Sequence, residues 1–220
     1  MRVIAGSAGG VRLAVPKRGV RPTMDRVKAA IFSSLGDAVV GARVLDLFAG
    51  SGALGIEALS RGAASAVFVE DDRQTAEVIE KNLAKTRLQA RVRKQDVFDF
   101  LRRASNADKF RIIFADPPYE KTQHGERHTE KLLKNEMLPQ LLETGGIFVL
   151  EKPPGEPLRE MQFWRVVRQK AYGATEALFL SKSAIGSRGE GSPRQRAKPR
   201  GAAASERGKR ASFNRQPAMA

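Results

Sequence analysis

The stretch VLDLFAGSGALG at residues 44–55 has the pattern of a buried strand, a glycine loop and the start of a helix. Glycines in such a loop let the backbone pass close to a ligand at the amino end of the helix. Gly50, Gly52 and Gly55 also satisfy the G-x-G-x-x-G pattern of dinucleotide-binding folds, although this match alone is weakly specific. The stretch predicts an open α/β sheet with a ligand site beside its first strand.

Short apolar strands alternate with helical patterns over residues 42–150, which is typical of a parallel sheet with crossover helices. The predicted strands are 43–47, 66–70, 90–93, 111–115 and 146–150, and the predicted helices are 53–61, 73–86, 97–104 and 128–143. The stretches 163–170 and 174–181 predict a closing antiparallel hairpin that turns near Gly173, with Phe163 and Trp164 packed under it.

The two ends of the chain differ from this central sheet domain, which we assign to residues 41–182. Residues 1–40 predict a small β element followed by a helix, whose apolar face carries Met24, Val27, Ile31 and Leu35 at helical spacing. Residues 183–220 are rich in Gly, Ser, Pro, Ala and Arg, and such a composition buries too little surface to fold. We therefore expect a disordered basic tail.

Four carboxylates recur in phase with the predicted strands. Asp46, Glu70, Asp96 and Asp116 each end or closely follow a strand, at separations of 24, 26 and 20 residues, which is about one β-α unit. They should therefore meet at the carboxyl edge of the sheet, where open α/β sheets bind ligands. An acid beside the glycine loop suits a cationic ligand and would repel a pyrophosphate.

S-adenosylmethionine, with its amino acid, sulfonium, ribose and adenine groups, matches this acidic edge. Glu70 can hold the ribose hydroxyls, and Asp96 can accept a hydrogen bond from the adenine amine. The predicted cofactor-binding residues are Asp46, Phe48, Ala49, Gly50, Ser51, Gly52, Glu70, Asp96 and Val97.

The tetrapeptide Asp116-Pro117-Pro118-Tyr119 stands directly behind the apolar run 112–115. Prolines fix the backbone, so a carboxylate, rigid carbonyls and an aromatic ring are held together at the end of a strand. This set suits a planar ring with an exocyclic amine, because the carboxylate and a carbonyl accept its N–H bonds while the ring stacks. We predict that these four residues form the catalytic site.

The chain carries a net charge of +15, and residues 181–220 alone hold ten Lys or Arg against two Glu. A basic body with a more basic tail favours a polyanionic partner. Arg21, Arg26 and Lys28 should lie off the apolar stripe of the first helix, free to meet RNA phosphates, although an ordinary solvated helix face fits them equally well.

Other observations limit the function class. The chain has no cysteine, which excludes disulfides, thiolate zinc sites and a cysteine nucleophile, and no apolar run long enough for a membrane helix. His124 and His128 have no matching third ligand, so we predict a polar substrate-facing loop there and no metal. We expect a cytoplasmic, monomeric enzyme without membrane partners.

The combination of the motifs around Arg21-Pro22-Thr23, residues 46–52, Glu70 and Asp116-Pro117-Pro118-Tyr119 resembles the RsmD family over about residues 1–182. Members of this family are bacterial small-subunit ribosomal RNA guanine-N2 methyltransferases. The resemblance implies a Rossmann-like class I methyltransferase sheet with an antiparallel last strand, S-adenosylmethionine as donor, and ribosomal RNA as partner within a small-subunit particle.

Two other functions remain open from the sequence. Asp-Pro-Pro-Tyr serves any exocyclic amine, so a DNA adenine-N6 methyltransferase is one alternative. A non-catalytic RNA-binding or ribosome assembly factor that keeps the fold is another. A nicotinamide oxidoreductase is more distant, because the acid at Asp46 disfavours a pyrophosphate.

Overall fold

The computed structural model describes residues 1–15, 24–119, 126–158 and 161–183. These residues belong to one compact unit that includes both the N-terminal segment and the sheet. Arg21, His124 and the predicted basic tail after residue 183 lie outside the described residues.

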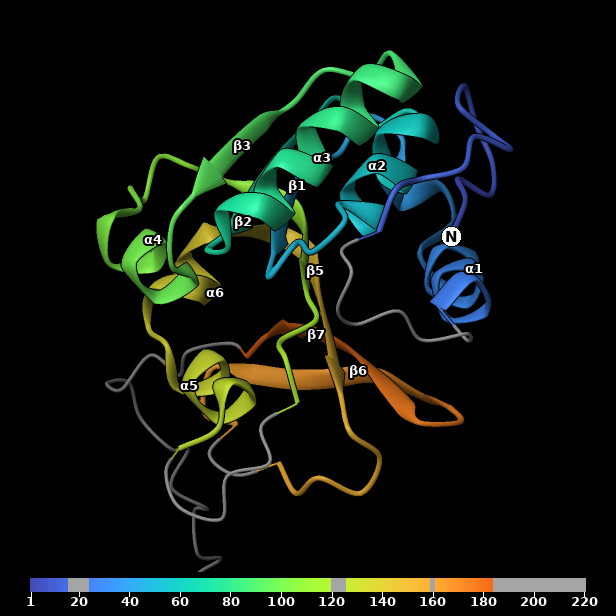
Figure 1. Cartoon of the computed structure of the whole chain (residues 1–220). Coiled ribbons are helices and arrows are strands. Elements are labelled where there is room, and N and C mark those ends of the chain that lie inside the picture. Colours follow the sequence, from blue (N-terminus) through green and yellow to red (C-terminus); the bar gives the residue numbers. More distant parts are fainter. Residues whose placement is uncertain (16–23, 120–125, 159–160, 184–220) are drawn as a thin grey trace, which may run out of the picture. The chain divides into compact units, whose positions relative to one another are not determined.

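A seven-stranded sheet forms the centre of the molecule, in the order β3-β2-β1-β4-β5-β7-β6 (Figure 1). The first five strands in this order are parallel, and β7 runs antiparallel to both of its neighbours. The mostly parallel sheet with an antiparallel last strand is therefore confirmed. The strands are β1 (Arg43–Leu47), β2 (Ser65–Glu70), β3 (Arg91–Lys94), β4 (Phe110–Ala115), β5 (Leu142–Lys152), β6 (Trp164–Tyr172) and β7 (Thr175–Lys182).

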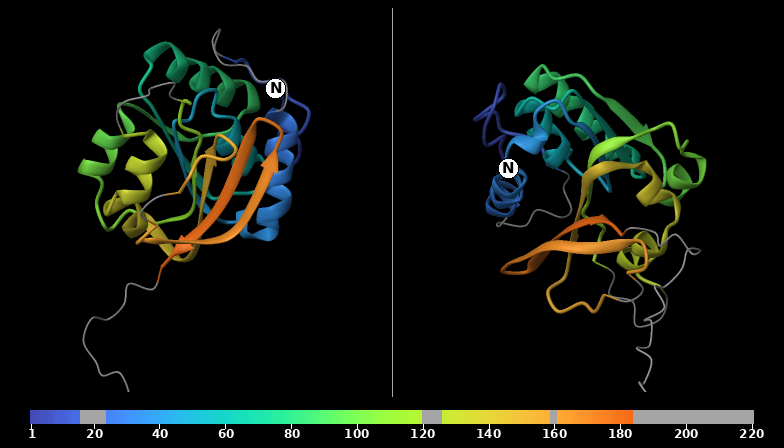
Figure 2. Two further views of the ribbon diagram at one scale, coloured as in Figure 1. Left: turned by 90° about the horizontal axis from the view of Figure 1, so that it is seen from below. Right: turned by 180° about the vertical axis from the view of Figure 1, so that it is seen from behind.

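Helices cover both faces of the sheet (Figures 1 and 2). One face carries α1 (Met24–Leu35) with the short 3-10 helix η1 (Gly36–Val39), α2 (Ala53–Ser60) and α3 (Arg73–Thr86). The other face carries α4 (Val97–Arg103), α5 (His128–Lys134) and α6 (Met137–Leu141). Each set buries an apolar cluster against the sheet, so the strands between them are apolar on both sides, as parallel strands require.

Local signals explain where several helices begin. The side chain of Asp72 caps α3 by accepting a hydrogen bond from the Thr75 N–H at 2.7 Å. Asp96 caps α4 in the same way through the Asp99 N–H at 2.9 Å. Such caps satisfy backbone donors that have no partner inside the helix.

The single helix predicted over residues 128–143 is wrong in its second half. The chain forms α5 and then a separate short α6, and β5 already begins at Leu142. The break occurs at Asn135, whose Oδ1 accepts hydrogen bonds from the N–H groups of Met137 and Leu138 at 3.0 and 2.8 Å. A side chain that caps a new helix start competes with continuation of the old helix.

The hairpin of β6 and β7 closes the sheet as predicted, with its turn at Gly173. Trp164 is buried and its ring lies 5.0 Å from that of Phe148, so its predicted structural role is confirmed. In Figure 2 the hairpin runs beside α1, and the Arg168 guanidinium donates a hydrogen bond to the Ser34 carbonyl across this boundary at 3.4 Å.

The N-terminal segment is fastened to α2. Arg2 and Arg12 form an antiparallel bridge, in place of a longer β element. The buried Glu57 carboxylate accepts hydrogen bonds from the N–H groups of Ile4 and Ala5 at 2.7 and 3.1 Å. Gly6 has a φ of +86°, and a Cβ there would lie 1.7 Å from the Ser60 carbonyl oxygen, so this contact requires glycine.

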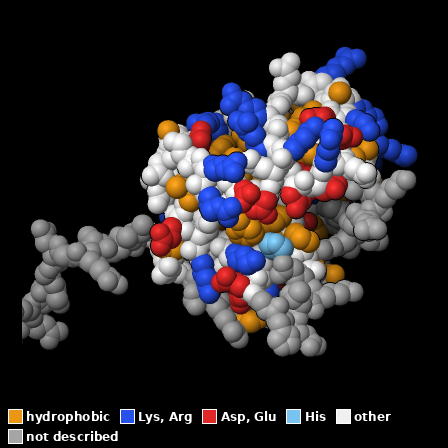
Figure 3. Space-filling model, turned by 60° about the vertical axis from the view of Figure 1, so that its left-hand side comes forward, with side chains coloured by type: hydrophobic (Ala, Val, Ile, Leu, Met, Phe, Trp, Pro, Cys, Tyr) orange, Lys and Arg blue, Asp and Glu red, His pale blue; other side chains and the backbone are white. Residues whose placement is uncertain are grey.

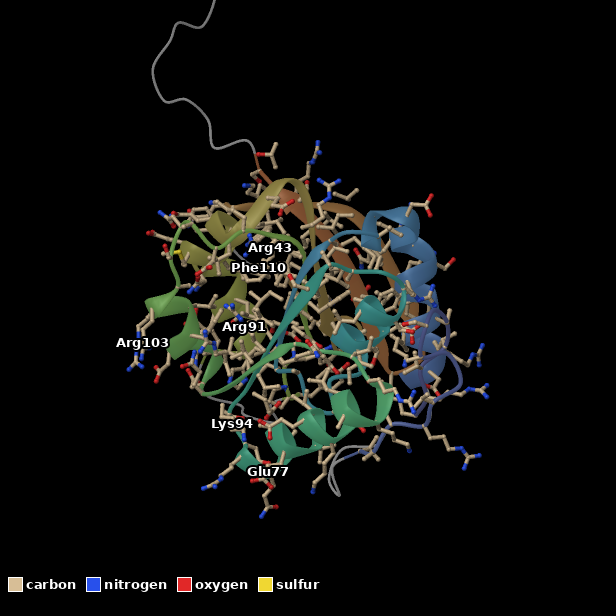
Figure 4. All side chains as sticks on the ribbon, turned by 90° about the horizontal axis from the view of Figure 1, so that it is seen from above. Arg43, Glu77, Arg91, Lys94, Arg103 and Phe110 are labelled. Atoms are coloured by element: carbon tan, nitrogen blue, oxygen red, sulfur yellow. The ribbon has the colours of Figure 1, made fainter. Side chains whose placement is uncertain are left out.

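The amino ends of the strands form the edge opposite the carboxylates. In Figure 4, Arg43 and Phe110 lie together at the starts of β1 and β4, and the guanidinium stands 5.5 Å from the ring centre. At the outer strand β3, Arg91 and Lys94 are exposed, and Lys94 pairs with Glu80 at 3.1 Å. Charged side chains on an edge strand discourage further strand pairing.

Candidate active site

The carboxyl ends of β1, β2 and β4 bring three of the four predicted acids together. Asp46 and Glu70 are 2% and 8% exposed, and Asp116 follows the last residue of β4. Asp96 follows β3 as expected, but it is exposed and its carboxylate caps α4. The predicted phase of the acids is therefore confirmed, with Asp96 at the rim.

Asp46 holds the start of α2 against β1. Its Oδ2 accepts a hydrogen bond from the Gly55 N–H at 2.9 Å. A Cβ at Gly55 would lie 2.3 Å from the Phe68 ring, so only glycine allows this approach. Burial, the largest cause, together with the charges of Asp116 and Glu70 raises the pKa of Asp46 to about 8, and the Gly55 hydrogen bond opposes the shift.

Glu70 fixes the glycine loop from the neighbouring strand. Its Oε2 accepts a hydrogen bond from the Gly50 N–H at 2.8 Å, and its Oε1 accepts one from the Asp72 N–H at 3.2 Å. Burial raises the pKa of Glu70 to about 7, against the effect of these two hydrogen bonds. Two buried acids with pKa values near neutrality form a site that favours a bound cation, because the cation stabilises their charged forms.

Phe48 adopts a backbone conformation that is unusual for a residue with a side chain. Its φ is +54°, in the left-handed region, where a non-glycine residue costs on the order of 1–3 kcal/mol. Its ring packs against Phe98 and His128, with ring centres 6.2 and 5.4 Å apart. The strained residue therefore carries an aromatic side chain from the loop toward α4 and α5.

The aromatic contacts of Phe48, Phe98 and His128 correct the prediction that His128 belongs to a polar loop. His128 is the first residue of α5, and it stacks on Phe98 at 5.8 Å with an angle of 11° between the planes. It is thus part of an ordered aromatic group, not of a polar loop. The sequence offered no periodic signal for this contact, because its members come from three separate elements.

A cavity of about 120 Å³ is lined by residues of the glycine loop and of α1 and by Asp116, the first residue of the tetrapeptide. Of the predicted residues, it is lined by Asp46, Phe48, Ala49, Gly50, Ser51 and Asp116. Gly52, Glu70, Asp96 and Val97 do not line it, and Val97 is buried in the apolar cluster under α4. Glu151 and Thr175, at the ends of β5 and β7, also line the cavity, and the sequence analysis did not single them out.

Of the tetrapeptide 116–119, only Asp116 lines this cavity. Pro117 is buried, Pro118 is exposed, and the Tyr119 hydroxyl shares a hydrogen bond of 3.0 Å with the Thr175 hydroxyl. The aromatic ring is therefore held by the last strand of the sheet, 56 residues further along the chain. Because of this separation, no local sequence pattern indicates the contact between Tyr119 and Thr175.

The three basic residues predicted to meet phosphates have different outcomes. Arg26 is exposed, and Arg21 is outside the described residues. The expectation for Lys28 is wrong, because its side chain is only 3% exposed. Its ammonium lies 3.3 Å from a Glu57 oxygen and donates a hydrogen bond to the Arg2 carbonyl at 2.6 Å.

The physical reason is the buried Glu57, which sits in the otherwise apolar face of α2 and needs positive partners. Lys28 from α1 and Arg61, the residue that follows α2, supply them, the latter at 2.7 Å. Burial lowers the pKa of Lys28, although the charge of Glu57 opposes this shift. An acid inside the apolar stretch ALGIEALS was a usable sequence signal for this cluster.

Asn82 is a further residue that the sequence patterns did not indicate. It is 1% exposed, and its amide exchanges two hydrogen bonds with the backbone of Ala14, at 2.8 and 2.9 Å. Its Nδ2 also donates to the Ser51 carbonyl at 2.9 Å. One side chain on α3 thus joins the N-terminal segment to the glycine loop.

The surface around the site mixes charges of both signs. On the face shown in Figure 3, Asp and Glu side chains lie beside exposed apolar side chains and a histidine, with Lys and Arg spread around them. Within the described residues, no helix has the length and apolar content that a membrane crossing requires.

Comparison with known proteins identifies the family. The family model described as "Conserved hypothetical protein 95" matches residues 1–181. "Ribosomal RNA small subunit methyltransferase D" of Haemophilus influenzae is 35% identical over 177 residues, which are 79% of this chain and 89% of that protein. The Escherichia coli K12 protein of the same name is 44% identical over 123 residues, covering 55% of this chain and 61% of that protein.

A solved structure shares the fold. The Thermus thermophilus 16S rRNA N2 G1207 methyltransferase (RsmC), in complex with AdoMet and guanosine, superposes with a TM-score of 0.56 and 27% identity, over 76% of this chain and 44% of that one. The motifs, the sheet order and these matches agree, and the chain belongs to the RsmD family of ribosomal RNA methyltransferases.

Proposed function

We propose that this enzyme transfers a methyl group from S-adenosylmethionine to the exocyclic N2 of a guanine in 16S ribosomal RNA. One observation carries the proposal. Asp116, the first residue of Asp116-Pro117-Pro118-Tyr119, lines the same cavity as Asp46 and the glycine loop, so an acid suited to an amine and an acid suited to a cation face one small space.

The residues of the cavity fit the donor. S-adenosylmethionine supplies an activated methyl group on a cationic sulfur, and it carries no phosphate. Asp46 and Glu70 place two buried carboxylates by the glycine loop, which suits a cation and disfavours a pyrophosphate. The ring of Phe48 and the exposed Asp96 lie on the side toward α4, where an adenosine group would find an aromatic surface and an acceptor.

The tetrapeptide would prepare the acceptor. An aryl amine is a poor nucleophile, because its lone pair is delocalised into the ring. The Asp116 carboxylate and the Pro117 carbonyl can accept its two N–H bonds and so direct the lone pair away from the ring. Tyr119, held by Thr175, offers a stacking surface, and stacking on an aromatic residue contributes about 1–3 kcal/mol per base.

Transfer then requires alignment. The new N–C bond forms as the carbon–sulfur bond breaks, and the amine gives up one proton. A positioned encounter of this kind is worth roughly 7–11 kcal/mol of the barrier. A base in structured RNA must leave its stack to reach Asp116, which is the general route of enzymes that act on bases.

We further propose that the substrate is ribosomal RNA within a small-subunit particle, that the enzyme is a monomer in the cytoplasm, and that Arg21 and Arg26 contact the RNA backbone. The exposure of Arg26 on α1 supports this role. Lys28 is not included in this RNA-binding proposal, because its ammonium is paired with Glu57.

Mass mapping of 16S rRNA from cells that lack this gene tests the function. We expect one N2-methylguanosine to disappear and to return when the gene is supplied again. Methyl transfer from labelled donor to naked duplex DNA, but not to ribosomal particles, would instead identify a DNA adenine methyltransferase. An unchanged methylation map together with a ribosome assembly defect would identify a non-catalytic factor.

A further inference from the structure

A second and larger cavity, of about 370 Å³, lies on the other side of the tetrapeptide from the donor cavity. This volume is within the range of small-molecule sites, about 300–1,000 Å³. Three chain segments line it: residues 117–119, residues 127–129 at the start of α5, and the loop 153–157 after β5. The donor-binding acids do not reach it, so it requires its own explanation.

The loop 153–157 is built to be rigid. It contains three prolines, and the Glu156 N–H donates to the Pro153 carbonyl at 3.3 Å, with Gly155 at a φ of +74°. This is the pattern of a type II turn with proline and glycine at its centre. Proline in such a position reduces the freedom of the unfolded chain and favours one geometry.

A buried lysine, the last residue of β5, holds the same loop through hydrogen bonds. Lys152 is 2% exposed, and its ammonium donates hydrogen bonds to the carbonyls of Pro153 and Glu156 at 3.2 and 3.0 Å. It also pairs with the buried Glu176 of β7. Although burial acts to raise it, hydrogen bonds from Lys152 and Gln169 hold the pKa of Glu176 below its usual value. The loop is therefore positioned before any ligand arrives.

Glu156 gives this cavity its chemical character. Its side chain is only 6% exposed. One oxygen, Oε1, accepts the Thr129 hydroxyl hydrogen bond and lies 3.5 Å from the Arg127 guanidinium. Among the residues that the structure describes, no hydrogen bond is made to Oε2. The cavity thus offers proline rings as apolar walls and one fixed carboxylate as acceptor.

This combination matches one nucleobase better than the others. Guanine has two adjacent donors, N1–H and N2–H, on its Watson–Crick edge. Adenine and cytosine each have an unprotonated ring nitrogen at the corresponding position, which a carboxylate would repel, and uracil has its N3–H between two carbonyls. Flat apolar walls suit the faces of the ring, and half-exposed Arg127 can meet its phosphate.

We propose that this cavity binds a guanine of the RNA substrate and that Glu156 is the residue that selects guanine over adenine there. The inference rests on the proposed function, since it takes RNA as the substrate. The guanine is either the one that is methylated or a neighbour that is unstacked with it. A neighbour can donate both N1–H and N2–H to Glu156, whereas the methylated guanine donates N1–H alone, because Asp116 and the Pro117 carbonyl accept its two N2–H bonds.

Binding of free nucleotides to the full chain tests the proposal, with S-adenosylhomocysteine present to fill the donor site. We expect GMP to bind at least about 10-fold more tightly than AMP, with chemical shift changes at residues 127–129 and 153–157. Glu156→Gln should reduce this preference to less than about 2-fold. Glu136→Gln removes the same charge from an exposed residue and should leave the preference unchanged.

Equal binding of GMP and AMP by the wild-type protein would overturn the proposal even if the Glu156 variant did not fold. So would a full GMP preference in Glu156→Gln. Labelled S-adenosylmethionine then distinguishes the two possible occupants. Transfer of label to GMP identifies the methylated guanine. If GMP competes with RNA for binding but receives no label, the occupant is the neighbouring guanine.

The outcome is separate from that of the proposed function. If 16S rRNA is methylated normally by Glu156→Gln with unchanged KM, the inference fails and the function stands. If the rRNA map is unchanged in cells lacking the gene, the function fails whatever GMP does.

Discussion

The donor side and the acceptor side of the carboxyl edge are built in different ways. On the donor side, buried carboxylates on β1 and β2 hold backbone N–H groups of a glycine loop and helix start that lie within 20 residues of them. On the acceptor side, the tetrapeptide is joined to Thr175 across 56 residues, and loop 153–157 depends on the Lys152–Glu176 pair. The donor side is therefore encoded locally, and the acceptor side exists only when distant segments meet.

This difference predicts that acceptor-side changes can abolish catalysis without loss of donor binding. Asp116→Ala should have the largest effect, because it removes the carboxylate that we propose accepts the amine hydrogen bond. We expect methylation to fall by about 10²–10⁴-fold, the usual range for a group that acts on a proton of the reacting atom. Affinity for S-adenosylhomocysteine, measured by calorimetry, should stay within about 3-fold.

Asp108→Ala is a matched control, since Asp108 is exposed and distant from both cavities. Full activity in Asp116→Ala would place the acceptor elsewhere. Loss of donor binding in proportion to activity would show that the two sides are not separable.

Asn82→Leu tests whether the N-terminal segment supports the donor side. It leaves the buried Ser51 carbonyl and two backbone groups of the exposed Ala14 without their side-chain partner. A buried group left unsatisfied costs about 1–3 kcal/mol. We expect a clear loss of thermal stability and roughly a 10-fold loss of donor affinity.

Gln74→Ala changes an exposed residue on the same helix and should alter neither quantity. Donor affinity that stays at the wild-type value in a folded Asn82→Leu protein would contradict the link between this segment and the glycine loop.

The buried acids predict a pH effect confined to the donor side. The pKa of Asp46 is raised from 3.8 to about 8, so the folded state holds a proton that the unfolded state loses. This contribution to stability is fully present below about pH 4 and is lost as pH rises through 8. Donor affinity should move in the opposite direction, because the cation favours the ionised acids.

Asp46→Asn cannot titrate and should flatten both trends between pH 6 and 9, with a donor affinity at least about 10-fold below wild type at pH 9. Thermal melts and calorimetry over this pH range measure the two slopes. Identical slopes in the wild-type and variant proteins would show that Asp46 does not titrate there.

Tyr119→Phe should have the smallest effect, because it keeps the stacking ring and loses only the hydrogen bond to Thr175. A neutral hydrogen bond contributes about 0.5–1.5 kcal/mol, so we expect a loss in kcat/KM of a few-fold to about 10-fold. Combination with Thr175→Val should add little, since both changes remove the same bond. Additive losses would mean that the two hydroxyls act independently.

Most of the donor side could be predicted from the sequence, because it is encoded locally. Periodicity and contacts between neighbouring units determine the strand, loop and helix of residues 43–60 and the phase of Asp46, Glu70 and Asp116. Prediction was wrong where a polar side chain is buried by a partner from another element. Lys28 was expected in solvent because its partner Glu57 could not be placed from the sequence.

The acceptor side was reached only through its tetrapeptide. Glu156 lies in a loop without a periodic pattern, and the predicted strand 174–181 does not indicate that Thr175 contacts Tyr119. The break at Asn135 depends on hydrogen bonds from the first N–H groups of α6 to the Asn135 side chain. Such features follow from tertiary contacts that no local pattern reports.

The position of β7 has a consequence for synthesis of the protein. This strand lies between β5 and β6, yet it is the last of the seven to leave the ribosome, and it supplies both Thr175 and Glu176. A nascent chain can therefore form the parallel sheet of β1, β2, β3, β4 and β5 before residues 175–182 are available to pair with β5. Until that strand is inserted, the donor cavity lacks the part of its wall that Thr175 forms, and Tyr119 lacks its hydrogen-bond partner.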